Sequence, residues 1–164
     1  GVTAGLVAFL LICSALTYER AKVWGSDVAF WSDTVSQSPN KPRGYTHLVY
    51  AYIHANRCSD AVKAAQGAPG GIKDTPEFLG MLGHAYTCES RIPEAVSAFE
   101  RAVQVGPGVG RYLALASSYR RAGRFADADA AEEKAMKLPP RTAYDFTMLD
   151  ALKRTQTRSR SIGR

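Results

Sequence analysis

The chain has 164 residues, of which 46% are hydrophobic and 22% are charged. This apolar fraction excludes an intrinsically disordered chain, and the length suits a single domain with its own core. Of the net charge of +6, five positive charges lie in the last twelve residues, on Lys153, Arg154, Arg158, Arg160 and Arg164. The nearly neutral remainder excludes the broad basic face that duplex nucleic acid requires, so no nucleic-acid partner is expected.

Residues 2–18 form an uninterrupted run without a charged side chain. A run of this length lies at the short end of the transmembrane range, and Tyr18 at its end, with Arg20 and Trp24 after it, is typical of an interface anchor. We therefore expect a transmembrane helix over residues 1–22 and a membrane localisation. The alternative is a buried helix of a globular protein. A cleaved signal peptide is disfavoured because a basic leader and a small-residue cleavage site are missing.

The rest of the chain repeats with a period of 34 or 33 residues. Two sets of residues carry this period, Tyr52, Tyr86 and Tyr119, and Ala61, Ala95 and Ala128. Pro107 and Pro140 follow the same spacing of 33. A repeat of this length predicts pairs of amphipathic helices, A and B, stacked into a solenoid.

The residues at this period resemble the tetratricopeptide repeat (TPR) family. The second repeat matches it best, with Leu82, Gly83, Tyr86, Ala95, Phe99, Ala102 and Pro107, whereas the first has Ala65 in place of the large aromatic residue. The resemblance implies an all-α TPR helical-hairpin solenoid of about 3.5 repeats plus a capping helix. We expect a linker and the second helix of a half repeat over 23–41, three repeats over 42–142, and a capping helix and basic tail over 143–164.

Two segments give sharper local signals. Thr75, Pro76 and Glu77 supply a helix cap, a first-turn proline and an acidic first turn, and so predict a helix start. Residues 67–71 contain three glycines and a proline, which predicts that the second helix of the first repeat ends early.

Motifs for catalysis are missing. The sequence contains no phosphate-binding glycine motif, no HExxH and no GxSxG, so we expect no catalytic residue, no cofactor and no enzyme activity. His47 and His54 share one helix face, and His84 and Cys88 share another, which would allow a metal site between adjacent A helices. Because no supporting carboxylate accompanies them, we expect no metal and instead assign them to the lining of a groove.

In TPR proteins the A helices line a concave groove that binds protein segments. Carrying these positions over predicts the groove residues Arg43, Thr46, Tyr50, His54, Glu77, His84, Ser117, Arg120, Arg121, Tyr144 and Arg154. The Lys and Asn set with which some family members clamp a peptide carboxylate is missing. The resemblance therefore implies a protein partner bound as an extended or helical segment.

Two functions compete. The first is a membrane-anchored TPR scaffold that serves as a structural or assembly subunit of a membrane protein complex. The second follows from the junction around Tyr18, Trp24, Trp31 and Pro39, which resembles membrane glycosyltransferases that carry TPRs after their last transmembrane helix; the chain would then be their non-catalytic C-terminal region. The basic residues 153–164 predict contact with an acidic protein surface or anionic lipid headgroups, or else a solvated end.

Cys58 and Cys88 are candidates for a disulfide. In the TPR arrangement, helix A of one repeat packs antiparallel against helix B of the repeat before it, which brings these two cysteines to one edge. The alternative is a pair of free thiols. A disulfide would persist in an oxidising compartment, and together with the glycosyltransferase-like junction it favours an extracytoplasmic (periplasmic) repeat region, whereas Arg20 and Lys22 favour the cytoplasm.

Overall fold

The computed structural model describes residues 2–162, without the side chains of 2, 4, 19, 20, 22, 23 and 156–162. All regular secondary structure in this range is helical, which confirms the all-α class. The helices are α1 (Val2–Val23), α2 (Asp27–Gln37), α3 (Pro42–His54), α4 (Cys58–Gly67), α5 (Gly70–Lys73), α6 (Pro76–Cys88), α7 (Ile92–Val105), α8 (Val109–Arg121), α9 (Phe125–Lys137) and α10 (Ala143–Ile162).

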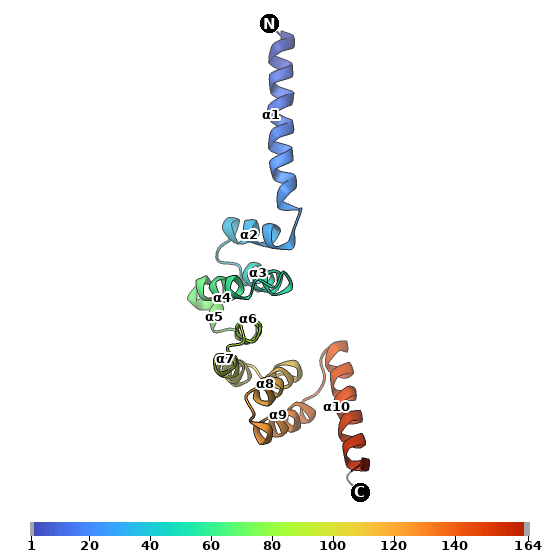
Figure 1. The fold of residues 1–164 in the computed structure, drawn as a ribbon. Helices are drawn as coiled ribbons and strands as arrows, with labels where there is room; N and C mark the ends of the chain where they lie inside the picture. Colours follow the sequence, from blue (N-terminus) through green and yellow to red (C-terminus); the bar gives the residue numbers. More distant parts are fainter. Residues whose placement is uncertain (1, 163–164) are drawn as a thin grey trace.

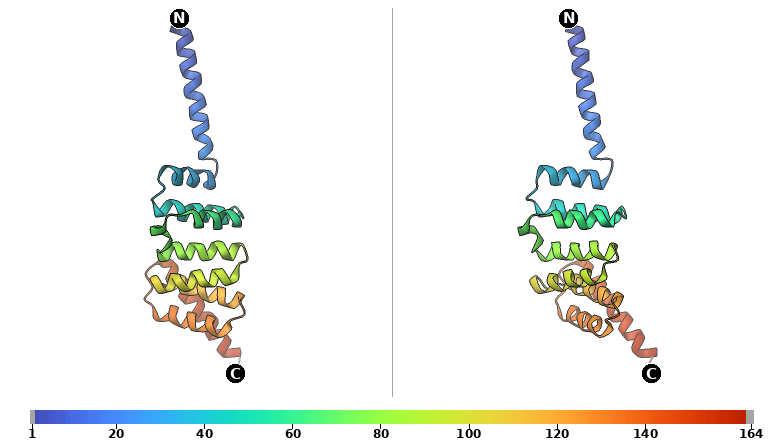
Figure 2. Two further views of the ribbon diagram at one scale, coloured as in Figure 1. Left: turned by 90° about the vertical axis from the view of Figure 1, so that its left-hand side faces the viewer. Right: turned by 60° about the vertical axis from the view of Figure 1, so that its left-hand side comes forward.

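Helices α2 to α9 form a layered stack (Figures 1 and 2). Helix α2 packs on α3, and the hairpins α3–α4, α6–α7 and α8–α9 follow one another, each packed on the next. Thr75 caps α6 by accepting a hydrogen bond from the Phe78 N–H, as its position before Pro76 predicts. Helix α4 ends at Gly67 as expected, and the four-residue α5 bridges the connection to α6.

The same set of contacts closes the turn between the A and B helices of each hairpin. An arginine guanidinium lies 4.3–4.8 Å from the ring centroid of the tyrosine five residues before it. Its Nε donates to the carboxylate three residues after it, at 2.7–2.9 Å. The residue before each arginine has a positive φ angle. The three sets are Tyr52, Asn56, Arg57 and Asp60; Tyr86, Ser90, Arg91 and Glu94; and Tyr119, Gly123, Arg124 and Asp127.

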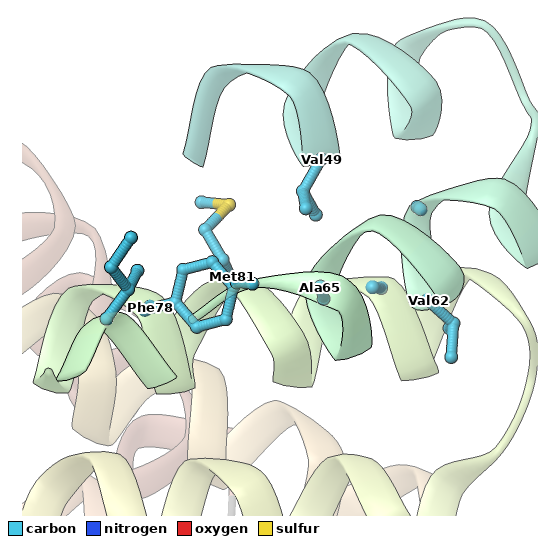
Figure 3. Packing of buried hydrophobic residues seen from close by; sticks show 9 residues of the cluster. Val49, Val62, Ala65, Phe78 and Met81 are labelled. Carbon is cyan, nitrogen blue, oxygen red and sulfur yellow. The ribbon is translucent and has the colours of Figure 1, made fainter. Parts of the chain in front are cut away.

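Small residues on one helix and larger ones on the next fill the core. Between α3, α4 and α6 the buried cluster includes Val49, Val62, Ala65, Phe78 and Met81 (Figure 3). In the second repeat, Gly83 takes the place of Val49, and Phe99 takes the place of Ala65. At these two corresponding positions the first repeat combines a medium-sized side chain with a small one, whereas the second combines glycine with a large ring. The combined side-chain volume is therefore similar in both repeats, which allows both cores to pack densely.

The stack ends at α9 because its outer positions become polar. Val62 and Val96 are buried, whereas the exposed Asp129 occupies the same position in the last repeat. Glu132 stands where Phe99 stands one repeat earlier and is bound by Arg120. A polar outer face is what the terminal repeat of a solenoid requires, because no further repeat covers it.

Helix α10 crosses the last hairpin obliquely and packs mainly against α8 (Figure 2). Among the side chains of α10 that the structure describes, Leu149 is buried, and it lies in a small cluster with Val109 of α8 and Ala135 of α9. Pro139 and Pro140 separate α9 from α10 and redirect the chain at this point. As a result, α10 lies beside the hairpin and leaves the polar outer face of α9 uncovered.

Helix α1 extends away from the stack (Figure 1), and its side chains Leu6, Phe9 and Leu11 are 61–65% exposed. Within the residues that the structure describes, no helix is both long and apolar enough to cross a membrane. The predicted membrane localisation, which rested on one transmembrane helix, is therefore wrong. The uncharged run of seventeen residues measures about 26 Å at ~1.5 Å per residue, which is less than the ~30 Å hydrocarbon core.

Candidate binding groove

A groove of about 760 Å³ lies where the A helices α3, α6 and α8 face the beginning of α10. It brings together Tyr50 of α3, His84 of α6, Ser117 of α8 and Tyr144 of α10, which span 94 residues of the chain. The connections before α8 and α10 contribute its remaining walls. In this structure α10 therefore forms one wall over a concave face that the A helices of all three hairpins provide.

His84 and Phe99 form part of the groove floor. The His84 ring meets the Phe99 ring edge-on, with centroids 5.0 Å apart. His84 remains open to solvent, yet the concave surface surrounds it with protein atoms. This partial burial lowers the pKa of His84 from its usual value, because the charged imidazolium loses hydration there. Near neutral pH the groove floor therefore presents the uncharged aromatic ring of His84, whose edge can form hydrogen bonds.

Tyr50 and Tyr144 approach each other from opposite walls. Burial raises the pKa of Tyr50, and the neighbouring Tyr144 raises it further. Tyr50 also stacks on His54, with ring centroids 6.1 Å apart. A Cβ atom placed on Gly110 of α8 would lie 3.7 Å from Cε1 of Tyr144, an ordinary contact distance, so the Tyr144 ring lies close to α8. The upper part of the groove is thus aromatic on both sides.

The polar rim of the groove comes from the first turns of α8 and α10 and from the connections that precede them. The Arg111 guanidinium donates to the Gly106 carbonyl at 2.6 Å and lies 3.5 Å from Glu77. Asp145 accepts hydrogen bonds from the N–H groups of Arg141 and Thr142, at 2.9 and 3.1 Å, and so fixes the start of α10. Charged groups therefore surround an aromatic interior.

Of the groove residues predicted from the sequence, Tyr50, His84, Ser117 and Tyr144 line this groove. Glu77 lines a smaller adjoining hollow of about 130 Å³. The groove also contains Phe99, Arg111, Asp145 and Met148, which the prediction of the site omitted. The glycine- and proline-rich connection of residues 106–110 and the two prolines before α10 were the signals that could have found the rim.

The other predicted groove residues make contacts elsewhere. Arg43 donates to His47 at 3.4 Å, and Thr46 donates to the Pro42 carbonyl at 3.2 Å, both within α3. Arg120 pairs with Glu132 and Asp129 of α9, and Arg154 pairs with Asp150 of its own helix at 2.7 Å. Arg121 is exposed at the end of α8.

The histidines that could have shared a metal ion are kept apart by aromatic contacts. His47 stacks on Trp31 with ring centroids 4.2 Å apart, while His54 contacts Tyr50 and His84 contacts Phe99. Among the described residues, no three His, Cys, Asp or Glu side chains gather in an arrangement that could hold a metal ion.

Cys58 and Cys88 form a disulfide in the structure, with their Cα atoms 5.3 Å apart. Cys58 begins α4 and Cys88 ends α6, so the bond joins the first hairpin to the second at the edge of the stack that carries the A–B turns. Cys88 directly follows Thr87, which lines the groove. The bond therefore ties together two repeats whose intervening connection is irregular.

The predicted basic tail lies partly outside the described residues. Lys153 and Arg154 are exposed on α10, whereas the side chains of Arg158 and Arg160, and the whole of Arg164, are not among those the structure describes.

The sequence matches no protein-family model and no curated protein. Solved structures match it by fold. TTC0263, a TPR protein of Thermus thermophilus, superposes with a TM-score of 0.67 at 18% identity over 76% of this chain and 70% of its own. MamA 41-end from Desulfovibrio magneticus RS-1 gives 0.60 at 16% identity over 79% and 70%.

A third match, MamA MSR-1, gives a TM-score of 0.55 at 21% identity over 66% of this chain. The chain spans 63% of the length of that structure. These likenesses establish that the helical stack has the TPR fold, as the repeat pattern predicts. They give no support to the predicted membrane glycosyltransferase junction.

Proposed function

We propose that this chain is a protein-interaction scaffold whose concave groove, lined by α3, α6 and α8, holds a segment of a partner protein. The observation that carries the proposal is the composition of the groove, since Tyr50, His84, Phe99 and Tyr144 provide a concave aromatic interior with a charged rim. Aromatic side chains supply large contact areas at low entropic cost and are enriched in protein interfaces. The chain would thereby act as a structural or assembly subunit of a complex.

The basic residues near the C-terminus would assist this binding. Lys153 and Arg154 lie on the same helix as Tyr144 and are exposed. They would attract an acidic partner surface and speed up association at low ionic strength, with little effect on the final affinity. Lys153→Gln together with Arg154→Gln should therefore slow association and reduce its dependence on salt.

Site-specific photo-crosslinking in the source cells tests the proposal. A photoreactive amino acid at Ser117, which is exposed inside the groove, should form an adduct with a defined protein. The matched control is Ser97, an exposed serine of α7 that lies outside this groove. The same adducts from both positions, or none from Ser117, would contradict the proposed function.

A further inference from the structure

Helix α10 occupies part of the concave face on which the proposed function places a partner. Tyr144, Asp145 and Met148 all line the groove, and Leu149 is buried against Val109 and Ala135. Leu152, one turn further along, is half-buried. Because residues at these spacings share one face of a helix, α10 presents a single apolar stripe to α8 and the groove.

This stripe is the main attachment of α10. Leu149 is 6% exposed, whereas Tyr144 and Phe146 are each 62% exposed. The hydrogen bonds of Asp145, Thr147 and Thr155, and the ion pair of Arg154, are all formed within residues 141–155. These hydrogen bonds and this ion pair therefore stabilise the helix itself, and apolar contact with α8 and the end of α9 attaches it to the stack.

The other helices of the stack are attached differently. Hairpins α6–α7 and α8–α9 bury several side chains on each helix, and each A–B turn is closed by its tyrosine–arginine–carboxylate contacts. Helix α10 has no partner helix of its own and follows two prolines that separate it from α9. Elements with few buried side chains detach at lower free energy than the packed core around them.

We propose that the concave face recognises an amphipathic helix with an aromatic residue five positions before a leucine, and that α10 is an internal, displaceable copy of that ligand. The incoming helix would place its leucine between Val109 and Ala135 and its aromatic ring beside Tyr50. This proposal rests on the proposed function and names its partner class. It makes α10 a competitor, so the apparent affinity for a partner is reduced by the fraction of molecules in which α10 is docked.

The test uses the full chain and a labelled synthetic peptide with the sequence of residues 141–155. In Leu149→Asp, a charge replaces the buried anchor, so α10 should detach and free the groove. The peptide should then bind at least about tenfold more tightly than it binds the unmodified chain. The matched control is Phe146→Asp, which introduces the same charge at an exposed position of the same helix and should leave the weak binding unchanged.

Peptide variants test the recognition itself. A peptide carrying Leu149→Asp should not bind, and one carrying Met148→Pro, which cannot form the central helical turn, should bind far more weakly than the parent. Equal binding of the proline peptide would show that the groove takes an extended segment and would overturn the proposal. The proposal would also be overturned if the parent peptide bound the unmodified and Leu149→Asp chains equally, or if it bound neither chain.

Hydrogen exchange separates detachment of α10 from loss of the fold. In Leu149→Asp, amide protection should fall in α10 and persist in α6, α7 and α8. If protection falls in those helices too, Leu149→Ala provides the second variant, because it weakens the same contact without a buried charge. Unchanged protection of α10 in both variants would overturn the proposal, whereas a partner crosslinked at Ser117 would still support the scaffold function.

Discussion

The ring of Phe99 lies against the Cα of Gly83, on the facing helix of the same hairpin. A Cβ atom at position 83 would lie 2.7 Å from two atoms of that ring and 2.8 Å from a third. Phe99 is 1% exposed, so its ring is enclosed almost entirely by neighbouring protein atoms. The closest approach of α6 and α7 therefore depends on one missing side chain, and the same ring supports His84 on the groove floor.

Gly83→Ala should destabilise the protein by about 1–3 kcal/mol, because the added methyl group overpacks a dense core. The measurement is the free energy of unfolding in urea. Gly80→Ala is the matched control on the same helix, since nothing lies within 4 Å of a Cβ there. It should instead stabilise α6 by about 0.5–1 kcal/mol through the higher helix propensity of alanine. Equal effects at both positions would contradict the steric explanation.

Arg120→Ala should destabilise the last hairpin more than Glu132→Gln does. Glu132 is 7% exposed and its carboxylate is bound by Arg120, so removing the arginine leaves a largely buried charge without this partner. The expected cost is about 1–3 kcal/mol. Arg121→Ala removes the neighbouring exposed arginine and should have an effect near zero. A similar loss for Arg120→Ala and Arg121→Ala in thermal unfolding would argue against the ion pair.

Reduction of the Cys58–Cys88 bond should lower the free energy of unfolding by ~2–4 kcal/mol, mainly because the unfolded chain regains freedom. Cys58→Ser with Cys88→Ser should reproduce this loss and make the protein insensitive to reductant. Cys13→Ser, on α1, should leave the response to reductant intact. Thiols at positions 58 and 88 that react with an alkylating agent before any reduction would refute the bond.

Tyr119 should ionise later than an ordinary tyrosine. Burial raises its pKa to about 12, assisted by the hydrogen bond that its hydroxyl donates to Glu100 at 2.6 Å and by the charge of that carboxylate. Because the unfolded tyrosine ionises near 10, the contribution of Tyr119 to stability is complete below that pH and is lost as the pH rises towards about 12.

Ultraviolet titration of the phenolate checks this expectation. Tyr119→Phe should remove one late-titrating tyrosine, and Glu100→Gln should shift the titration of Tyr119 to lower pH, because the carboxylate no longer opposes the phenolate. The comparison with Tyr45→Phe controls for loss of any one tyrosine. A titration curve in which Tyr119→Phe leaves the late phase intact would contradict the assignment.

The repeat period by itself determined the stack of hairpins. Tyr52, Tyr86 and Tyr119 recur because each hairpin is closed by the same local contacts, and local contacts leave a direct record in the sequence. The early end of α4 at Gly67 followed for the same reason, since glycine and proline act on the backbone next to them. His84, one of the two residues named for the groove floor, was also predictable from its place in the repeat.

Only the tertiary structure decided where α1 and α10 lie and which group Arg120 binds. An apolar run indicates that its burial is favourable, but it does not identify the surface that would cover it. Residues 2–18 therefore did not show how α1 lies relative to the stack. From its place in the repeat, Arg120 could face the groove or pair with Glu132. The packing of α9 against α8 decided that it pairs with Glu132. The position of α10 depends on contacts between residues far apart in the chain, such as Leu149 with Val109. Such contacts follow no period, and the sequence therefore could not specify them without the fold.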